Sequence, residues 1–465
     1  MTLQATRYTY RGKKVLIFGL GLLGGGVATA KWFINQGAKV TITDLKTKEE
    51  LKSSLKQIKG KYTLSLGKHK LADIKTANFV VVNPGVPANL PILRKAKILI
   101  NEATVFYDTF PGHIIGVTGT RGKTTTTHWI AHLLGKKAVM AGNSPEHPFL
   151  KAISYKLKAN TYAVTEMSSF SLELFSKETR KPDIAVITNI FQDHFNRYAS
   201  YRDYVATKAN LFINQKPDQH LILNYDNSWT PHLLSLPHKS QEWFFSLQKL
   251  PSELSGLYFG NGKGYFSHAG ETKEVLLLHD IIQWGNHNIE NLLAAALAAH
   301  AVGVQWHEIQ SRLADLPQVP FRQETIYHDA RLTIINDTTA TSPEGTIAAA
   351  KRFGAPTTIL ITGGTDRNLE FTGWAKIIPN YIVPENIVML KGSATDKMLR
   401  ALKAHSKKIV VRDTLEVCLE EAIKKARQFP QATILFSPGS KSFEKFKNEY
   451  DRGEQFNKLV KKLLK

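Results

Sequence analysis

Residues 116–127 read GVTGTRGKTTTT and combine the features of a loop that binds phosphate groups. The stretch follows the apolar run HIIGV and precedes an expected helix from Thr124 through HWIAHLLG, so its N–H groups lie at a strand-to-helix turn, which attracts anions. Lys123 can neutralise phosphate oxygens, and Thr124 or Thr125 can place a hydroxyl on Mg²⁺. The regular P-loop pattern needs glycine at 117, where this chain has Val117. A chance Gly-Lys-Thr is the alternative, but the flanking strand and helix favour a shortened phosphate loop.

A second glycine turn lies near the start of the chain, in KKVLIFGLGLLGGGVATAKWFINQGAKVTITDL, residues 13–45. Gly19, Gly21 and Gly24 fit G-x-G-x-x-G between an expected strand and helix, and Asp44 ends the next strand. This pattern predicts a nucleotide site in which Asp44 accepts hydrogen bonds from a ribose or a base. The alternative is a tight turn that packs a helix on a strand. The later strand NFVVVNPGVP ends in another glycine turn, at Gly85.

Strand-like and helix-like segments alternate along the chain in three blocks, which predicts an α/β protein of three domains. We expect a Rossmann-like N-terminal domain over 1–111, a P-loop-type ATPase domain with a parallel sheet over 112–318, and a Rossmann-like C-terminal domain over 319–465. The middle block has the strands TYAVTE, DIAVITNI and HLILNYD and closes with the helix NHNIENLLAAALAAHAVG. The third has LTIIND, TTILITGG, NIVMLKG, KIVVRD and ATILFSPG, and PQVP before it is a predicted linker.

The composition is that of an ordinary folded protein, with 43% hydrophobic and 22% charged residues. The single cysteine, Cys418, excludes an internal disulfide and predicts a reducing compartment. We find no apolar signal-peptide core at the start and no apolar run of membrane-spanning length. These observations predict a soluble, cytoplasmic protein without stable membrane insertion.

The net charge of +22 is the unusual feature of the composition, and it would suit nucleic acid, a membrane surface or small polyanions. The lysines are scattered, with the densest run in NKLVKKLLK at the C-terminal end, so we interpret the excess as a solvated basic surface. The sequence has no aromatic-interleaved basic motif, RNA-binding signature or helix-turn-helix pattern. We therefore expect no nucleic-acid partner, and we expect a monomer.

The shortened loop T-G-T-x-G-K-T-T resembles the ATP loop of the Mur ligase family, whose members form amide bonds by activating a carboxylate with ATP. Other motifs follow in matching order: AVTEMSSFSLE with Glu166, ITNIFQDHFNRY with Asp193 and His194, YRDYVATKANLF with Lys208, and GNHNIENLLAA. The resemblance implies ATP and Mg²⁺ as cofactors. The catalytic residues it implies are Lys123, Glu166, His194 and Lys208, and the metal ligands are Thr124, Glu166, His194 and Lys208, the last as a carbamate. For ATP binding it implies Gly119, Thr120, Arg121, Gly122, Lys123, Thr124, Thr125, Asn288, Asn291, Arg322 and Asp337.

The flanking blocks resemble the family member that adds D-glutamate to UDP-N-acetylmuramoyl-L-alanine in peptidoglycan precursor synthesis. The supporting stretches are GLGLLG with Asp44, then FRQETI, INDTTATS, GGTDRNLEF and SPGSKSFEKFKNEYDRGEQF. The UDP-linked substrate would contact Gly21, Leu22, Leu23, Asp44, Lys46, Gly85 and Asn143. D-glutamate would contact Thr341, Arg367 and Ser442. The active site would then assemble by closure of the domains around PQVP.

Four departures from the family pattern leave the amino acid substrate open. Arg121 replaces an asparagine in the loop, and Thr339 replaces a lysine. Ser144 follows Asn143 where the family has G-N-I-G, and Glu449 stands where an aromatic residue is usual. The alternatives are a related ligase with a different acceptor or amino acid, a basic nucleic-acid-binding ATPase, and a dehydrogenase that uses the GLGLLG turn.

Overall fold

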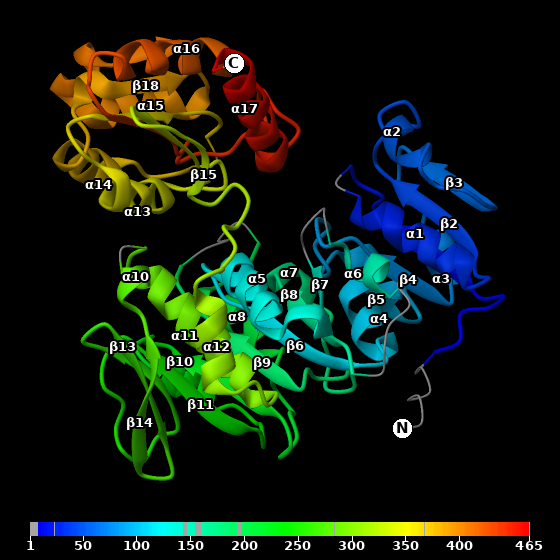
Figure 1. The fold of residues 1–465 in the computed structure, drawn as a ribbon. Coiled ribbons are helices and arrows are strands. Elements are labelled where there is room, and N and C mark those ends of the chain that lie inside the picture. The colour runs from blue at the N-terminus through cyan, green and yellow to red at the C-terminus, as the bar shows by residue number, and fades with distance from the viewer. Residues whose placement is uncertain are drawn as a thin grey trace. The chain divides into compact units, whose positions relative to one another are not determined.

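The computed structural model describes residues 8–22, 24–142, 147–153, 160–192, 197–282, 284–366 and 368–464. The chain forms two compact units, Met1–Pro317 and Gln318–Lys465. The division falls inside the PQVP segment. The described residues form three β-sheets, two in the first unit and one in the second (Figure 1). The predicted α/β class is confirmed, whereas the three domain boundaries stay a prediction.

The first sheet has the order β3-β2-β1-β4-β5, and all its strands are parallel. Its strands are β1 (Lys14–Phe18), β2 (Lys39–Asp44), β3 (Tyr62–Leu66), β4 (Phe79–Val82) and β5 (Leu99–Ile100). Its helices are α1 (Gly25–Asn35), α2 (Lys52–Leu55), α3 (Leu71–Thr76), η1 (Pro91–Lys95) and α4 (Glu102–Thr109). Because the strands are parallel, the glycine turn after β1 and Asp44 at the end of β2 meet at one edge, as the sequence predicts.

The second sheet has the order β14-β13-β12-β11-β10-β9-β6-β8-β7. Its strands are β6 (His113–Thr118), β7 (Ala138–Gly142), β8 (Tyr162–Glu166), β9 (Ile184–Ile187), β10 (His220–Asn224), β11 (Gln241–Ser246), β12 (Gly256–Gly260), β13 (Lys263–His268) and β14 (Glu271–Leu277). Its helices are α5 (Lys123–Leu134), η2 (Gly135–Lys137), α6 (Phe149–Ala152), α7 (Ser169–Leu172), α8 (Tyr201–Ala209), α9 (Thr230–Leu234), α10 (His279–Ile282), α11 (Asn286–Ala301) and α12 (Trp306–Leu313). The four predicted strands, β6, β8, β9 and β10, are confirmed.

One edge of the second sheet differs from the all-parallel expectation. Strand β13 runs antiparallel to both of its neighbours, β12 and β14. Two-residue turns, Asn261-Gly262 and Ala269-Gly270, connect them, and all four residues have positive φ. Such turns permit only an antiparallel hairpin, and Asn-Gly is a strong sequence signal for them. The signal is present in GNGKG, and our sequence analysis missed it.

The third sheet, in the second unit, has the order β15-β16-β20-β17-β18-β19. Its strands are β15 (Glu324–His328), β16 (Leu332–Asn336), β17 (Thr358–Thr362), β18 (Ile387–Leu390), β19 (Val410–Arg412) and β20 (Ala432–Phe436). Its helices are α13 (Pro343–Phe353), α14 (Thr372–Ile377), η3 (Ile378–Asn380), η4 (Pro384–Asn386), α15 (Ser393–Leu402), η5 (Lys403–Lys408), α16 (Leu415–Ala426) and α17 (Glu449–Leu463). All five predicted strands are confirmed, and the unpredicted β15 pairs antiparallel with β16.

Apolar strands are buried on both faces because successive side chains point to opposite sides of a sheet. In β1, Val15 and Ile17 pack on the side of α1, while Leu16 and Phe18 pack on the side of α3. A continuous buried cluster runs from Val15 to Leu221 in β10 and thus joins the first two sheets. This shared core explains why the two sheets belong to one unit.

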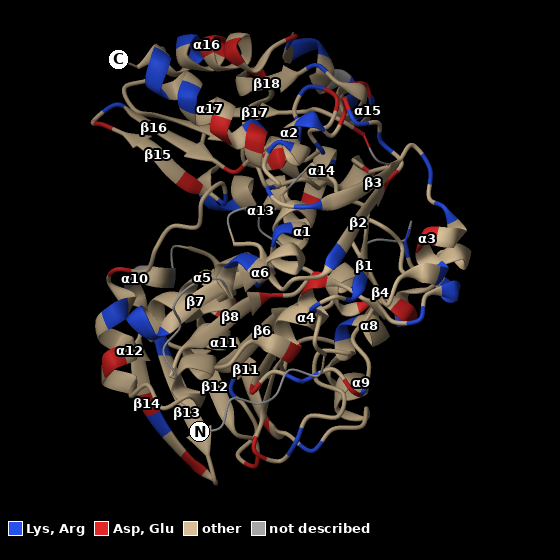
Figure 2. Cartoon of the chain, turned by 90° about the vertical axis from the view of Figure 1, so that its right-hand side faces the viewer, with Lys and Arg blue, Asp and Glu red and all other residues tan. Residues whose placement is uncertain are grey.

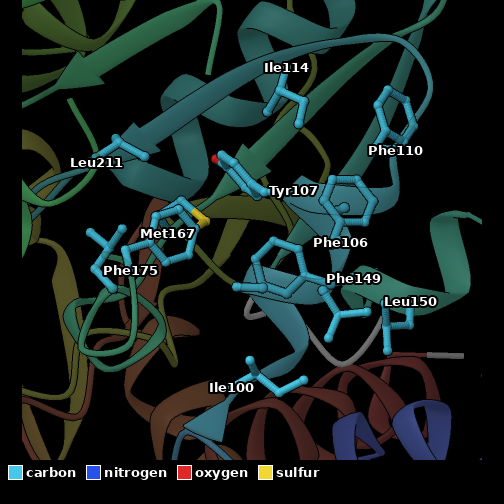
Figure 3. Packing of buried hydrophobic residues seen from close by; sticks show 14 of the residues in the cluster. Ile100, Phe106, Tyr107, Phe110, Ile114, Phe149, Leu150, Met167, Phe175 and Leu211 are labelled. Atoms are coloured by element: carbon cyan, nitrogen blue, oxygen red, sulfur yellow. The ribbon is translucent and has the colours of Figure 1, made fainter. Parts of the chain in front are cut away.

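Aromatic side chains fill the cluster at the connection between these sheets (Figure 3). The ring centroid of Phe106 lies 5.1 Å from that of Phe110 and 5.5 Å from that of Phe149. Arg180 donates to the carbonyl oxygens of Phe110 and Gly112 at 2.7 and 2.8 Å, which fixes the segment between α4 and β6.

Among the described residues, no helix has both the length and the apolar character that crossing a membrane requires.

Replacing Phe106 by alanine should lower the free energy of unfolding by about 3–5 kcal/mol, because the fully buried ring leaves a cavity among other rings. Urea denaturation of the full chain measures this change. The control is Leu277→Ala, since Leu277 is 52% exposed and its loss should change the free energy by about 0.5 kcal/mol or less. Equal losses in the two variants would contradict a core shared between the sheets.

Candidate functional site

The loop between β6 and α5 takes its shape from the neighbouring strand β9. Thr120 N donates to the carbonyl oxygen of Asn189 at 2.8 Å, and Arg121 N donates to Asn189 Oδ1 at 2.9 Å. Thr188 Oγ1 donates to the carbonyl oxygen of Arg121 at 2.6 Å. The residues that follow β9 therefore brace the loop by both backbone and side-chain hydrogen bonds.

Gly122 lies at the N-terminus of α5 in close contact with α11. A Cβ atom at this position would lie 2.1 Å from Asn291 Oδ1, so a larger residue cannot fit without displacing Asn291. The same oxygen accepts a hydrogen bond from Thr126 Oγ1 at 3.3 Å, and Asn291 Nδ2 donates to Asn288 Oδ1 at 3.3 Å. The two asparagines predicted to bind ATP are thus brought beside the phosphate loop.

Two lysines predicted to be catalytic meet at one carbonyl group of the loop. Lys123 Nζ donates to the carbonyl oxygen of Gly119 at 3.1 Å, and Lys208 Nζ donates to the same oxygen at 2.8 Å. Lys208 comes from α8, is only 1% exposed, and lies over the ring of Tyr204 at 4.7 Å. Two ammonium groups at one turn create a local positive field that suits a polyphosphate.

Glu166 is the last residue of β8, and its Cα partners are Val117 in β6 and Gly142 in β7. This register puts it level with the end of β6, just before the phosphate loop. His194, predicted as a metal ligand, lies outside the described residues, as does its neighbour Asp193. The described part of the chain has no group of three or more His, Cys, Asp or Glu side chains that could hold a metal ion. The predicted magnesium ligands, which include Thr124 and a carbamate, stay a prediction.

The carboxylate of Asp44 organises the glycine turn of the first sheet. Its Oδ2 accepts hydrogen bonds from Leu20 N at 2.9 Å and Gly21 N at 3.2 Å, and its Oδ1 accepts one from Lys46 N at 2.9 Å. The backbone N–H groups of Leu20 and Gly21 therefore point to Asp44 in this structure. Asp44 acts here on the turn itself, a contact that our sequence analysis did not foresee.

Leu22 and Gly85, also predicted for the UDP-linked substrate, lie at the same edge. Leu22 is 54% exposed, and Gly85 N donates to Asn83 Oδ1 at 2.9 Å. A Cβ atom on Gly21 would lie 3.5 Å from Asn83 Nδ2. Because Asn83 also holds Gly85, the two glycine turns are neighbours. Leu23 and Asn143 lie outside the described residues.

The close approach of helix and strand occurs at Gly26 and not at Gly24, the third glycine of the predicted pattern. A Cβ atom on Gly26 would lie 2.1 Å from the carbonyl oxygen of Leu20, whereas one on Gly24 would meet no atom within 4 Å. The run GGG at 24–26 allowed either assignment from sequence.

An ion pair between Arg197 and Glu173, which the sequence analysis did not predict, lies beside the turn that follows β4 of the first sheet. Arg197 Nε and Nη2 donate to the two carboxylate oxygens of Glu173, each at 2.8 Å. Arg197 Nη2 also donates to the carbonyl oxygens of Pro84 and Val86, at 3.2 and 2.9 Å. The pair thus holds the NPGVP turn next to Arg197, in the motif ITNIFQDHFNRY. Taken singly in the sequence, both residues look like solvated surface charges.

In the second unit, Arg452 joins two loops predicted to bind the nucleotide and the amino acid. It is fully buried, and its Nη2 donates to the carbonyl oxygens of Thr338 at 2.7 Å and Ser440 at 3.2 Å. Its Nη1 donates to the carbonyl oxygens of Ser440 and Lys441, and its Nε donates to Thr338 Oγ1. Burial lowers the pKa of Arg452 to about 10. Arg452 is part of the motif SPGSKSFEKFKNEYDRGEQF, but the sequence did not predict this role.

These loops carry the remaining predicted residues of the second unit. Asp337 accepts hydrogen bonds from Ser437 Oγ at 2.7 Å and Gln323 N at 3.2 Å, and burial raises its pKa to about 7. Thr341 Oγ1 accepts a hydrogen bond from Lys441 Nζ at 3.1 Å. Ser442 is buried, and its hydroxyl has no hydrogen-bond partner in the part of the chain that the structure describes.

Arg322 belongs to the same unit, where its positive charge opposes the increase in the pKa of Asp337. Arg367 lies outside the described residues.

A buried carboxylate, Glu102, lies beneath the glycine turn of the first sheet. Its Oε2 accepts a hydrogen bond from Thr29 Oγ1 at 3.1 Å, and its Oε1 lies near Gly25 at the start of α1. A cavity of about 10 Å³ beside it is also lined by Gly19, Gly26 and Asn83. Burial raises the pKa of Glu102 to about 7.

The raised pKa of Glu102 predicts a pH-dependent cost to stability. The folded state holds the proton more tightly than the unfolded chain, so stability should fall as pH rises from about 4.5 to about 7 and stay low above that. The full cost is roughly 3 kcal/mol. Glu102→Gln should remove this dependence and be the more stable form at pH 8, as measured by urea denaturation across pH. Glu49→Gln, at an exposed site, is the control, and equal pH profiles for Glu102→Gln and the parent would refute the assignment.

Comparison with known proteins identifies the family of the chain. Residues 117–299 match the family model of the Mur ligase middle domain, and residues 13–102 match that of the Mur ligase MurD-like N-terminal domain. Two relatives are named UDP-N-acetylmuramoylalanine–D-glutamate ligase. The one from Roseiflexus sp. (strain RS-1) is 34% identical, covering 97% of this chain and 98% of its own. The one from Borreliella afzelii (strain PKo) is 32% identical, covering 96% and 97%.

Solved structures of MurF have the same fold. MurF from Acinetobacter baumannii has a TM-score of 0.58 at 16% identity, covering 99% of this chain and 92% of its own. MurF ligase from Thermotoga maritima in complex with ADP has a TM-score of 0.54 at 16% identity, covering 91% and 96%. Because it is 34% identical to a named ligase over nearly the whole of both chains and matches two family models in order, the chain belongs to the Mur ligase family.

Proposed function

We propose that this protein is an ATP-dependent ligase that joins D-glutamate to UDP-N-acetylmuramoyl-L-alanine in peptidoglycan precursor synthesis. The observation that carries the proposal is the length of the match, since relatives named for this reaction align with 96–97% of the chain. The ammonium of Lys123, which lies at the Gly119 carbonyl, provides positive charge that phosphoryl transfer needs.

The reaction has two steps. A carboxylate resists attack by an amine because oxide would have to leave. The phosphoryl group of bound ATP converts this oxygen into part of a good leaving group, phosphate, and Mg²⁺ would neutralise phosphate charge. An oxygen of the L-alanyl carboxylate bonds to the γ-phosphorus while the bond to the β–γ bridging oxygen breaks and ADP leaves. The amine of D-glutamate, after losing a proton, then bonds to the acyl carbon while the C–O bond to phosphate breaks.

The side chains of the first unit hold and neutralise the reacting phosphates. Lys123 turns from the loop carbonyls to the terminal phosphate oxygens, and the first turn of α5 donates its N–H groups. Thr124, Glu166 and His194 would hold Mg²⁺, and a carbamate on Lys208 would hold a second ion. Asn288 and Asn291 contact the nucleotide. Lys208 already lies at the loop, so a carbamate on its Nζ would replace the hydrogen bond to Gly119.

The other substrates are assigned to the remaining loops. The glycine turn organised by Asp44, together with the Gly85 turn, receives the UDP-linked substrate. Thr341, Arg367 and Ser442 bind D-glutamate. The hydroxyl of Ser442 has no hydrogen-bond partner among the described residues and can form one with this substrate. We further propose that the protein is a cytoplasmic monomer.

The rival within the family is a ligase for another amino acid, which the departures at Thr339 and Glu449 support. The test is release of phosphate from ATP and Mg²⁺ with UDP-N-acetylmuramoyl-L-alanine, comparing D-glutamate with a panel of amino acids and reading the product by mass. We expect D-glutamate alone to support turnover and the product to gain one glutamyl residue. Turnover with a different amino acid would replace the substrate assignment and leave the ATP chemistry in place.

Lys123→Ala should abolish formation of the acyl phosphate, since the ammonium that neutralises the γ-phosphate is lost, and kcat should fall roughly 10²-fold or more. Single-turnover assays with radiolabelled ATP measure this step. Lys137→Ala, which removes an exposed lysine of η2, serves as the matched control and should keep full activity. An unchanged melting temperature shows that the Lys123 variant is folded, and retained turnover would exclude Lys123 from the site.

A further inference from the structure

Positive charge is concentrated in the first block of the chain. Residues 1–111 contain 18 Lys and Arg against 6 Asp and Glu, a net charge of +12 out of +22 for the whole chain. The excess positive charge is therefore not evenly scattered, as the sequence first indicated, because more than half of it lies in less than a quarter of the residues. Figure 2 marks these lysines and arginines in blue along the first sheet and its helices.

A pocket of about 530 Å³ opens at one edge of this sheet. It is lined by the first residues of three neighbouring strands, β1, β2 and β3, and by the end of α3. The glycine turn and Asp44 lie at the opposite edge, where these strands end. Leu16 and Thr41 line the pocket and come three residues before Gly19 and Asp44, so the pocket and the turn are about 10 Å apart at their nearest. The pocket is therefore separate from the proposed substrate site.

Three lysines stand in a row at the mouth of this pocket. Lys14 and Lys39 are directly opposite in the register of β1 and β2, and Lys61 comes just before Tyr62, the register partner of Val40. Neighbouring strands lie about 4.8 Å apart, and like charges directly opposite each other destabilise a sheet. All three side chains are exposed, and none forms an ion pair within the described residues. The row keeps an electrostatic cost that a bound anion would remove.

The rest of the pocket is polar in a way that suits a phosphorylated molecule. Thr41 and Thr63 are register partners on its floor and can donate hydroxyl hydrogen bonds. Asp73 is the acidic residue among those that line it, and its Oδ2 is buried and has no hydrogen-bond partner among the described residues. The volume falls within the range of pockets that hold small molecules.

We propose that this pocket is a second anion site, which binds a molecule with two or more phosphate charges through Lys14, Lys39 and Lys61. The ligand is either a free phosphorylated small molecule or the headgroup of an anionic lipid, and the two share this chemistry. The site does not depend on the proposed ligase reaction, because it lies at the other edge of the sheet.

The test compares two triple variants that remove the same charge from the same block. The pocket variant is Lys14→Gln/Lys39→Gln/Lys61→Gln, and the control is Lys31→Gln/Lys56→Gln/Lys95→Gln, whose lysines are exposed and outside the pocket lining. The probe is inorganic tripolyphosphate, measured by calorimetry on the full chain at low salt. Parent and variants all carry Lys123→Ala, so that the phosphate loop contributes equally to each.

We expect tripolyphosphate to bind the pocket variant roughly tenfold more weakly than the parent and the control to bind like the parent. Without probe at low salt, the pocket variant should also melt at a higher temperature than the control, because the opposed lysines no longer repel each other. The melting temperature of the parent should rise on adding tripolyphosphate, and that of the pocket variant should not.

A second arm separates the two sources of phosphate by sedimentation with vesicles of phosphatidylcholine, with and without phosphatidic acid. Loss of vesicle binding in the pocket variant alone, with weak tripolyphosphate binding by the parent, would identify a lipid headgroup as the ligand. Equal behaviour of the pocket and control variants towards both probes would overturn the proposal and leave only a general effect of charge.

Discussion

The hydrogen bonds between the end of β9 and the loop after β6 are the constraint on which the nucleotide site depends. A glycine-rich loop has little conformational preference of its own, so its shape must come from neighbours. Thr188 and Asn189 provide it, by holding the backbone of Thr120 and Arg121. Once the loop is held there, Lys208 from α8 reaches the Gly119 carbonyl, and Asn291 from α11 packs against Gly122. Helices distant in sequence thus contribute to one site because each contacts the same four-residue turn.

In the second unit, a buried cation, Arg452, fixes the shape of the loops. Arg452 has five N–H groups, and the five hydrogen bonds of this side chain reach the loops after β16 and β20. An arginine away from water is tolerated when all its donors are satisfied, and removing it would leave several carbonyl groups unpaired. Arg452 therefore holds together the loops that carry Thr341 and Ser442. The hydroxyl of Ser442 has no hydrogen-bond partner among the described residues.

The first sheet has different chemistry at its two edges. At the carboxyl ends of the strands, Asp44 holds the glycine turn, and buried Glu102 lies beneath the start of α1. At the amino ends, Lys14 and Lys39 face each other without acidic partners among the described residues. A parallel sheet places all strand starts on one edge and all strand ends on the other, so lysines that begin successive strands must gather. The same geometry that builds the substrate edge also builds the basic one.

The sequence alone was sufficient for the α/β class, for the five strands of the third sheet and for the position of the phosphate loop, because continuous apolar runs and glycine turns act over a few residues. It also identified Lys123, Lys208, Asn288 and Asn291 as neighbours of that loop, through the resemblance to a family. The hairpins of β12–β14 had a local signal in Asn261-Gly262 that was overlooked.

The tertiary structure alone decided which charged residues are paired, buried or opposed. Arg197 and Glu173 are 24 residues apart, and the partners of Arg452 at Thr338 are 114 residues away, so no local pattern marks them. Likewise, Lys14 and Lys39 become neighbours only through the register of β1 and β2. The physical reason is range: hydrophobic periodicity and turn chemistry are written in adjacent residues, whereas burial and electrostatic partners depend on the folded path of the whole chain.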